Sequence, residues 1–336
     1  MSNSKLAPVI IPTLNRFNHF KRCLESLEAC KLSNKTDVYI GLDYPPSEKY
    51  IEGWQKINDY LLKKEKSNCF NTLNVIRWET NKGVYGPSSN AALVLEMVRE
   101  NYDRYIISED DNEFSYRFLE FMNNGLTKFK NDESVFGVCG YMYPIDFHNS
   151  SDFNSILLRK MSAWGWGTWF DRRLSREEMF SLIDEMIADE KFKKMMYKAK
   201  INGYTGIVGM KKNNCILGDC FYTSYLYYKN KYCLFPKVTL VRNLGWDGSG
   251  LHGGKVKGFS DRVIEDKIED DFKIVLANNE DSIKYDHLIE KYFKNYKSTI
   301  HTILDYTTFY CYEYVGFFPE FIFFRKLYRR LRSWLK

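Results

Sequence analysis

Short apolar runs alternate with longer amphipathic segments along the chain. The apolar runs predict strands over residues 7–12, 37–43, 73–77, 105–108 and 235–241. The amphipathic segments predict helices that begin near Phe17 and that cover residues 51–66, 91–99, 118–126 and 177–200. In the first half, strands and helices follow one another in βαβ order. This order predicts an α/β fold with a mainly parallel sheet that is covered by helices on both faces.

Three consecutive acids, Glu109, Asp110 and Asp111, follow the strand expected at residues 105–108. Adjacent carboxylates repel one another, so a fold tolerates them where a cation or a cationic partner occupies the site. Carboxylate oxygens are the preferred ligands of Mg²⁺ and Mn²⁺, and open α/β sheets bind ligands beyond the carboxyl ends of their strands. We therefore expect a site for a metal ion and a diphosphate. An acidic turn that caps a helix beginning near Ser115 is the alternative.

The charge of the chain is concentrated at one end. Of a net charge of +6, all is carried by residues 325–336, which hold six bases and no acid. The other residues are neutral overall, so we expect no nucleic-acid partner. Eight cysteines without C-x-x-C spacing and only five histidines argue against a structural zinc site. With no apolar run after a basic start at the N-terminus, we expect no secretory signal and a cytoplasmic protein.

Several motifs, taken in order, resemble nucleotide-sugar glycosyltransferases of the GT-A fold. They are a strand that ends in Pro-Thr-x-Asn-Arg at residues 12–16, Asp43 at the end of the second strand, an Asn-x-Gly loop from Asn81, and the acidic triplet. Residues 109–115 are similar to the signature of the N-acetylglucosaminyltransferase I group, and the loop from Asn81 looks more like the broad family-2 glycosyltransferases. The resemblance covers about residues 7–255. It implies a GT-A domain over residues 1–260, with a Rossmann-like, mostly parallel sheet flanked by helices, a donor half to about residue 115 and an acceptor half after it.

The resemblance also implies roles for single residues. The nucleotide-sugar donor would be bound by Thr13, Arg16, Asp43, Asn81, Glu109 and Asp110. Asp111 would ligate Mn²⁺ or Mg²⁺, which would stabilise the charge on the departing nucleoside diphosphate. His252, in the glycine-rich loop 245–254, would complete the metal or diphosphate shell, although Leu251 stands where the family has serine. The alternatives are that Arg16 is a solvated arginine at the start of a helix and that Asp43 is an aspartate in a turn. The loop from Asn81 would then be an ordinary glycine turn, and His252 an exposed histidine.

The second half of the chain offers residues for an acceptor and for the chemistry. Residues 161–169 contain three tryptophans and two glycines, and indoles stack on sugar rings. We expect Trp164 and Trp166 to bind the acceptor and Trp169 to lie in the core. The alternative is that all three tryptophans are core residues. An inverting transfer needs a carboxylate that takes the proton of the acceptor hydroxyl. The resemblance implies that Asp219, before an aromatic helical run, is this base; a helix N-cap is the alternative.

The C-terminal part changes in character. Residues 261–316 predict a helical extension, and residues 317–336 predict a basic amphipathic helix. In this helix aromatic and leucine side chains lie on one face and bases on another, which is typical of a helix on an anionic membrane surface. We therefore expect a peripheral protein at the inner face of the plasma membrane. Docking of this helix on the catalytic domain or on a second copy of the chain is the alternative.

Together these features predict a metal-dependent, inverting glycosyltransferase. The first donor to test is UDP-GlcNAc, and the expected acceptor is a glycan, a lipid-linked oligosaccharide of bacterial surface polysaccharide synthesis. A sugar nucleotidyltransferase is an alternative, but residues 13–16 lack the glycines of its phosphate loop. A non-catalytic carbohydrate-binding protein would explain the tryptophans and not the acidic strand end. A retaining mechanism is also open.

Overall fold

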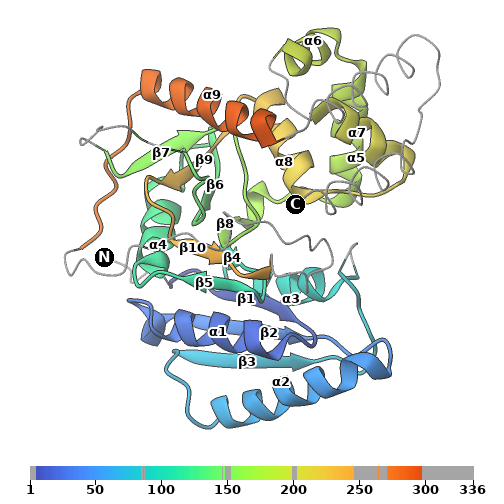
Figure 1. The fold of residues 1–336 in the computed structure, drawn as a ribbon, viewed down its shortest axis with the longest axis vertical. Helices are drawn as coiled ribbons and strands as arrows, with labels where there is room; N and C mark the ends of the chain where they lie inside the picture. Colours follow the sequence, from blue (N-terminus) through green and yellow to red (C-terminus); the bar gives the residue numbers. More distant parts are fainter. Residues whose placement is uncertain are drawn as a thin grey trace, which may run out of the picture.

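The computed structural model describes residues 5–84, 86, 88–145, 147, 153–198, 203–245, 264 and 271–296. The first half of the chain alternates strands and helices, as the apolar pattern predicts (Figure 1). Its elements are β1 (Val9–Thr13), α1 (Phe17–Glu28), β2 (Asp37–Leu42), α2 (Ile51–Lys64), β3 (Thr72–Arg77), α3 (Asn90–Arg99) and β4 (Arg104–Ile107), with short 3₁₀ helices η1 (Ser33–Lys35) and η2 (Glu48–Tyr50). Each expected strand of this half is confirmed to within about two residues.

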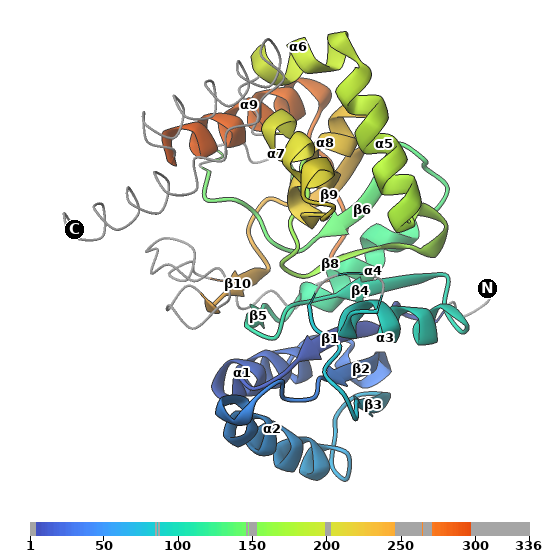
Figure 2. The same ribbon diagram turned by 90° about the vertical axis from the view of Figure 1, so that its right-hand side faces the viewer.

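The second half adds strands and a group of helices. Its elements are β5 (Asn112–Phe114), α4 (Phe118–Lys128), β6 (Val135–Cys139), β7 (Ser155–Leu158), β8 (Trp166–Trp169), η3 (Phe170–Arg172), α5 (Arg176–Ala188), α6 (Glu190–Lys198), α7 (Gly203–Lys212), α8 (Gly218–Tyr228), β9 (Tyr232–Pro236), β10 (Val241–Asn243) and α9 (Asn279–Tyr296). Helices α5 to α9 gather at one end of the molecule, away from α1 and α2 (Figures 1 and 2).

Eight strands form one sheet in the order β3-β2-β1-β4-β8-β6-β9-β7. The first four are parallel, whereas β8 runs antiparallel to both β4 and β6. The predicted α/β class, a Rossmann-like sheet flanked by helices, is confirmed. The purely parallel part of the sheet is made of β3, β2, β1 and β4. Strand β1 lies between β2 and β4, so the order of the strands reverses beside β1. Open sheets bind ligands at such a switch point.

Strand β1 is buried on both faces because helices cover both of them. Val9 and Ile11 belong to the core that α1 completes, while Ile10 packs with Val94 and Val98 of α3 on the other face. Successive side chains of a strand point to opposite faces, so a continuous apolar run is what this position requires. This packing fixes where the carboxyl end of β1 lies.

One predicted strand differs from the structure. The strand expected over residues 235–241 is two strands, because β9 ends at Pro236 and β10 starts at Val241. The helix predicted over residues 118–126 is confirmed as α4, and β5 separates it from the acids. The acidic triplet therefore does not cap a helix. The expected helical stretch at residues 177–200 contains α5 and α6.

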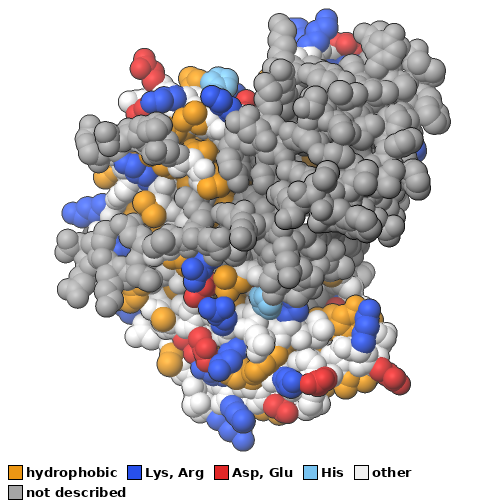
Figure 3. Space-filling model, viewed as in Figure 1, with side chains coloured by type: hydrophobic (Ala, Val, Ile, Leu, Met, Phe, Trp, Pro, Cys, Tyr) orange, Lys and Arg blue, Asp and Glu red, His pale blue; other side chains and the backbone are white. Residues whose placement is uncertain are grey.

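The C-terminal part is described only as far as residue 296. Helix α9 lies beside β7, where the carboxylate of Asp286 accepts hydrogen bonds from the backbone and side chain of Arg159. Within the described residues, the structure contains no helix that is both long and apolar enough to cross a membrane. Residues 317–336 lie outside the described residues. On the described part of the face in Figure 3, basic and acidic side chains are interspersed.

Candidate functional site

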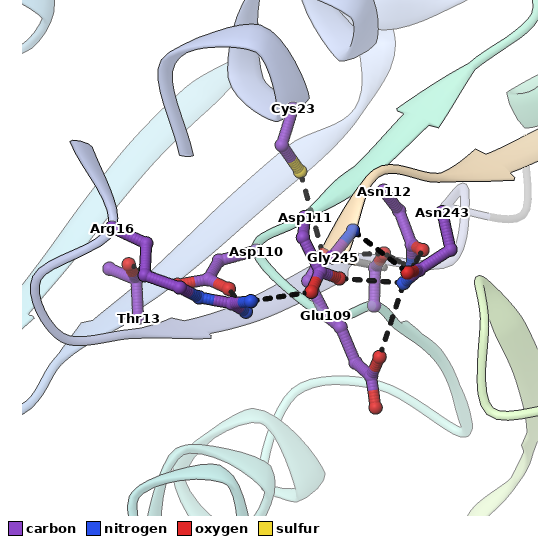
Figure 4. Close-up of polar contacts among 10 residues, drawn as sticks. Thr13, Arg16, Cys23, Glu109, Asp110, Asp111, Asn112, Asn243 and Gly245 are labelled. Atoms are coloured by element: carbon purple, nitrogen blue, oxygen red, sulfur yellow. Dashed lines mark hydrogen bonds and ion pairs between the residues drawn. The ribbon is translucent and has the colours of Figure 1, made fainter. Parts of the chain in front are cut away.

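The carboxyl ends of β1 and β4 meet at the switch point, and their polar residues bind one another (Figure 4). Arg16, at the start of α1, donates from Nη1 to Asp111 Oδ2 at 2.7 Å and from Nη2 to Asp110 Oδ1. Thr13, the last residue of β1, donates to Asp110 Oδ2 at 2.8 Å. Both aspartates are buried. Four residues of the predicted site are thus brought together by two neighbouring parallel strands.

Strand β10 closes the site from another side. Asn243 Nδ2 donates to Asp111 Oδ1 at 2.7 Å, and the backbone N–H of Leu244 donates to the Asp111 carbonyl at 2.8 Å. A Cβ built on Gly245 would lie 2.1 Å from Asp111 Oδ2, so only glycine allows this close approach. Sequence reasoning missed Asn243 altogether. Gly245 opens the predicted glycine-rich loop, but its contact with the acids could not be foreseen.

The electrostatics of the cluster follow from burial and from the paired charges. Burial alone would lower the pKa of Arg16, but the carboxylates of Asp110 and Asp111 raise it above its ordinary value. Burial also raises the pKa of Asp110, and Arg16 opposes that rise. The two aspartates therefore hold a permanently charged guanidinium between them.

Glu109 differs from its two neighbours. Its side chain reaches solvent and projects away from Arg16 (Figure 4), and its carboxylate lies 3.5 Å from Asn243 Nδ2. Loss of bulk water and repulsion from Asp111, Asp219 and Asp110 raise its pKa to about 8. Glu109 is thus the accessible acid of the triplet.

Asp219, the predicted base, lies in the first turn of α8. Its side chain is exposed to solvent, but neighbouring protein atoms limit its hydration, and this partial desolvation raises its pKa to about 6. Asp219 also contributes to the raised pKa of Glu109, so the two carboxylates lie within electrostatic reach of each other. The fold thus places a carboxylate of the second half of the chain within electrostatic reach of Glu109 in the first half.

The acids have the chemistry of a divalent-metal site. Their oxygens are hard ligands, and the guanidinium between Asp110 and Asp111 marks a position that is built for positive charge. The residues thus fit Mn²⁺ or Mg²⁺ in kind. In the part of the chain that the structure describes, no three metal-ligating side chains converge into a metal site. His252, the other expected ligand, lies outside the described residues.

Asp43 and Asn81 contact each other near the carboxyl end of β2. The buried Asp43 carboxylate accepts hydrogen bonds from the backbone N–H groups of Tyr44 (2.9 Å), Lys82 (2.7 Å) and Gly83 (3.0 Å) and from Asn81 Nδ2 (3.2 Å). Asp43 therefore clamps the glycine loop to β2. Contact of either residue with a nucleotide stays a prediction.

The tryptophans of residues 161–169 occupy different environments. Trp166 is only 8% exposed in β8 and packs against Tyr105, Phe136 and Tyr222, with ring centroids 5.8–6.1 Å away. In this structure its ring packs inside the core because β8 lies inside the sheet, and an acceptor role for Trp166 stays a prediction. Trp169 is buried, as expected.

Trp164 is partly buried against Tyr141, at a centroid distance of 4.5 Å. Gly165, with a φ of +66°, makes the turn between Trp164 and the strand, in a conformation that side chains other than glycine rarely adopt. An acceptor role for Trp164 stays a prediction.

Comparisons with known proteins find likeness in structure and none in sequence. No family model matches the chain, and no curated protein matches it. A solved mannosyltransferase, PcManGT from Pyrobaculum calidifontis in complex with GDP-Man and Mn²⁺, is 11% identical, covers 67% of this chain and 70% of its own, and has a TM-score of 0.38. A segment of S. aureus TarS is 12% identical, covers 67% of this chain and 92% of its own, and has a TM-score of 0.38.

A further match is the TarS segment in complex with UDP-GlcNAc. It is 16% identical, covers 48% of this chain and 44% of its own, and has a TM-score of 0.33. These enzymes belong to the class that the sequence motifs resemble, nucleotide-sugar glycosyltransferases. TM-scores below 0.5 leave the function of this chain to be inferred from the residues of its site.

Proposed function

We propose that the chain is a metal-dependent, inverting glycosyltransferase that moves a sugar from a nucleotide sugar to a glycan acceptor. The observation that carries the proposal is that Asp219 lies within electrostatic reach of Glu109, next to the two aspartates that are paired with Arg16. A sugar transferase needs positive charge at a diphosphate and a base at the acceptor, close to each other. Here the two parts come from opposite halves of the chain.

The donor would lie at the switch point, beyond the carboxyl ends of β1 and β4. Arg16 is suited to a diphosphate because its planar guanidinium can bind two oxygens at once. Asp111, with His252, would hold Mn²⁺ or Mg²⁺, which supplies Lewis-acid stabilisation of the leaving nucleoside diphosphate. Glu109 and Asp110 would bind the ribose or the sugar.

The acceptor would lie on the side of α8. As the acceptor oxygen attacks the anomeric carbon and the bond from that carbon to the diphosphate oxygen breaks, Asp219 takes the proton of the attacking hydroxyl. A pKa of about 6 makes Asp219 a stronger base than an ordinary aspartate, while it remains mostly ionised at neutral pH. Trp164 would offer its ring to the acceptor sugar.

The identity of the donor, the acceptor and the membrane partner is proposed from the sequence. UDP-GlcNAc is the first donor to test, and a lipid-linked oligosaccharide is the acceptor that fits a membrane-bound tail at residues 317–336. Deletion of these residues is expected to abolish binding to liposomes that contain anionic lipid and to leave binding to neutral liposomes unchanged. Equal binding of the truncated chain to anionic liposomes would contradict the membrane role.

The test of the proposal is calorimetric binding of UDP-GlcNAc, UDP-Glc, UDP-Gal, UDP-GalNAc and GDP-Man with and without Mn²⁺. We expect Mn²⁺-dependent binding of one of these donors. Asp111→Ala should abolish that binding, whereas Asp219→Ala should keep it and lose transfer. If no donor binds, or if both variants lose donor binding equally, the proposed division of roles is wrong. The anomeric configuration of the product, read by NMR, tests inversion.

A further inference from the structure

All four carboxylate oxygens of Asp110 and Asp111 have partners. Arg16 takes one oxygen of each aspartate. Thr13 donates to the second oxygen of Asp110, and Asn243 donates to the second oxygen of Asp111. The guanidinium therefore bridges the two carboxylates, and the neutral side chains of Thr13 and Asn243 bind their remaining oxygens.

The position of the guanidinium is the one that a divalent ion would need. Asp111 Oδ2 already lies 2.7 Å from Arg16 Nη1, and the backbone of Gly245 packs against the same oxygen. A metal ion that binds this oxygen has to displace Nη1, because two cations in contact would repel. The ion pair and the metal are thus alternative states of Asp111.

Arg16 is able to leave while the aspartates stay. Its side chain is 23% exposed, whereas those of Asp110 and Asp111 are 8% and 7% exposed. Thr13 and Asn243 keep the two carboxylates in place after Arg16 moves. A guanidinium binds phosphate oxygens in the same two-pronged way as carboxylates, so a diphosphate offers Arg16 an equivalent partner.

We propose that Arg16 is an internal counterion that fills the cation position of the donor-free protein and moves from the two aspartates to the diphosphate when metal and donor bind. The second part of this inference rests on the proposed function, whereas the competition between Arg16 and a divalent ion does not. It follows that metal and donor bind cooperatively. The metal frees Arg16 for the diphosphate, and the diphosphate holds Arg16 away from the metal.

The test measures Mn²⁺ binding to the full chain by calorimetry without any nucleotide. For Arg16→Ala we expect the affinity for Mn²⁺ to rise about tenfold or more, the range of a typical coupling between competing ligands. Arg242→Ala is the matched control, because it also removes an arginine that is paired with an acid, Glu113, in the neighbouring two-stranded sheet of β5 and β10. We expect the control to bind Mn²⁺ as the natural chain does.

A second measurement uses UDP as the probe. In the natural chain, saturating UDP should raise the affinity for Mn²⁺, and in Arg16→Ala this increase should shrink towards none while UDP binding weakens. Arg16→Lys keeps a charge without the two-pronged geometry and should lie between the two. A melting temperature within a few degrees of the natural chain identifies the variants that are folded.

Two outcomes overturn the inference. Mn²⁺ affinity that falls or stays unchanged in folded Arg16→Ala and Arg16→Lys would show that Arg16 does not compete with the metal. A full effect of UDP on Mn²⁺ binding in both variants would show that Arg16 does not move to the diphosphate. A chain that binds no nucleotide sugar but gains Mn²⁺ affinity in Arg16→Ala would keep the counterion role and refute the proposed transferase.

Discussion

Replacing Asp43 by alanine tests whether this residue works by holding the glycine loop. The side chain is 5% exposed and accepts three backbone hydrogen bonds, from Tyr44, Lys82 and Gly83. Asp43→Ala leaves those N–H groups without their acceptor. Residues 81–83 are at least partly exposed, so water can satisfy part of what is lost.

The size of the effect can be worked out from these contacts. A hydrogen bond to a charged group contributes about 1.5–3 kcal/mol, and replacement by water reduces the sum of three to about 2–4 kcal/mol of unfolding free energy. For a chain of 336 residues, the entropy of unfolding converts this loss into a melting temperature about 3–6 °C lower. Hydrogen exchange should speed up at Lys82 and Gly83 in particular.

Asp37→Ala is the matched control. Asp37 is equally buried at the opposite end of β2, where it accepts hydrogen bonds from Asn71, Thr72 and Tyr102. Both variants should melt earlier in a thermal scan, but only Asp43→Ala should also weaken nucleotide binding. If Asp43→Ala loses nucleotide binding with no change in melting temperature or in loop exchange, Asp43 contacts the ligand directly and the clamp is not its function.

Three further predictions concern the acids and the tryptophans. Because a base must be ionised and the pKa of Asp219 is about 6, transfer should rise about tenfold between pH 5 and pH 7 and then level off, and the residual activity of Asp219→Asn should lack this profile. The raised pKa of Glu109 makes its ionised form unfavourable in the folded protein, so Glu109→Gln should stabilise the protein when metal and donor are missing. This gain in unfolding free energy should be zero near pH 4, should grow as the pH rises above 4.5, and should level off above about pH 8. A constant difference across this pH range in thermal scans would contradict that reasoning. Trp166→Ala should lower the unfolding free energy by about 3–5 kcal/mol, measured by urea titration, whereas Trp164→Ala should mainly weaken acceptor binding.

Local pattern predicted the parts of the site that follow strands directly. The apolar runs identified β1 and β4, and the polar residues after them, Arg16 on one side and Asp110 and Asp111 on the other, do meet. The sequence also indicated that a cationic partner could balance these acids. It could not indicate that Arg16 is this partner, because nothing local determines where a long side chain turns.

Other features depend on pairings between distant segments. Asn243 reaches Asp111 only because β10 pairs antiparallel with β5, and no periodicity within either segment reveals that register. Trp166 is buried because β8 inserts between β4 and β6, so a segment with the composition of a ligand loop became an interior strand.

The pairing of β5 with β10 also affects the order in which parts of the protein can fold. Asp111 and Asn243 are separated by 132 positions in the chain, so their contact closes a very long loop. Contacts of this kind carry a high entropic cost and form late in folding. A growing chain could assemble β1 to β4 on the ribosome and pair Arg16 with the aspartates well before β10 emerges. Arg16 would then balance the charge of Asp110 and Asp111 during synthesis, before Asn243 and Gly245 are available to pack against Asp111.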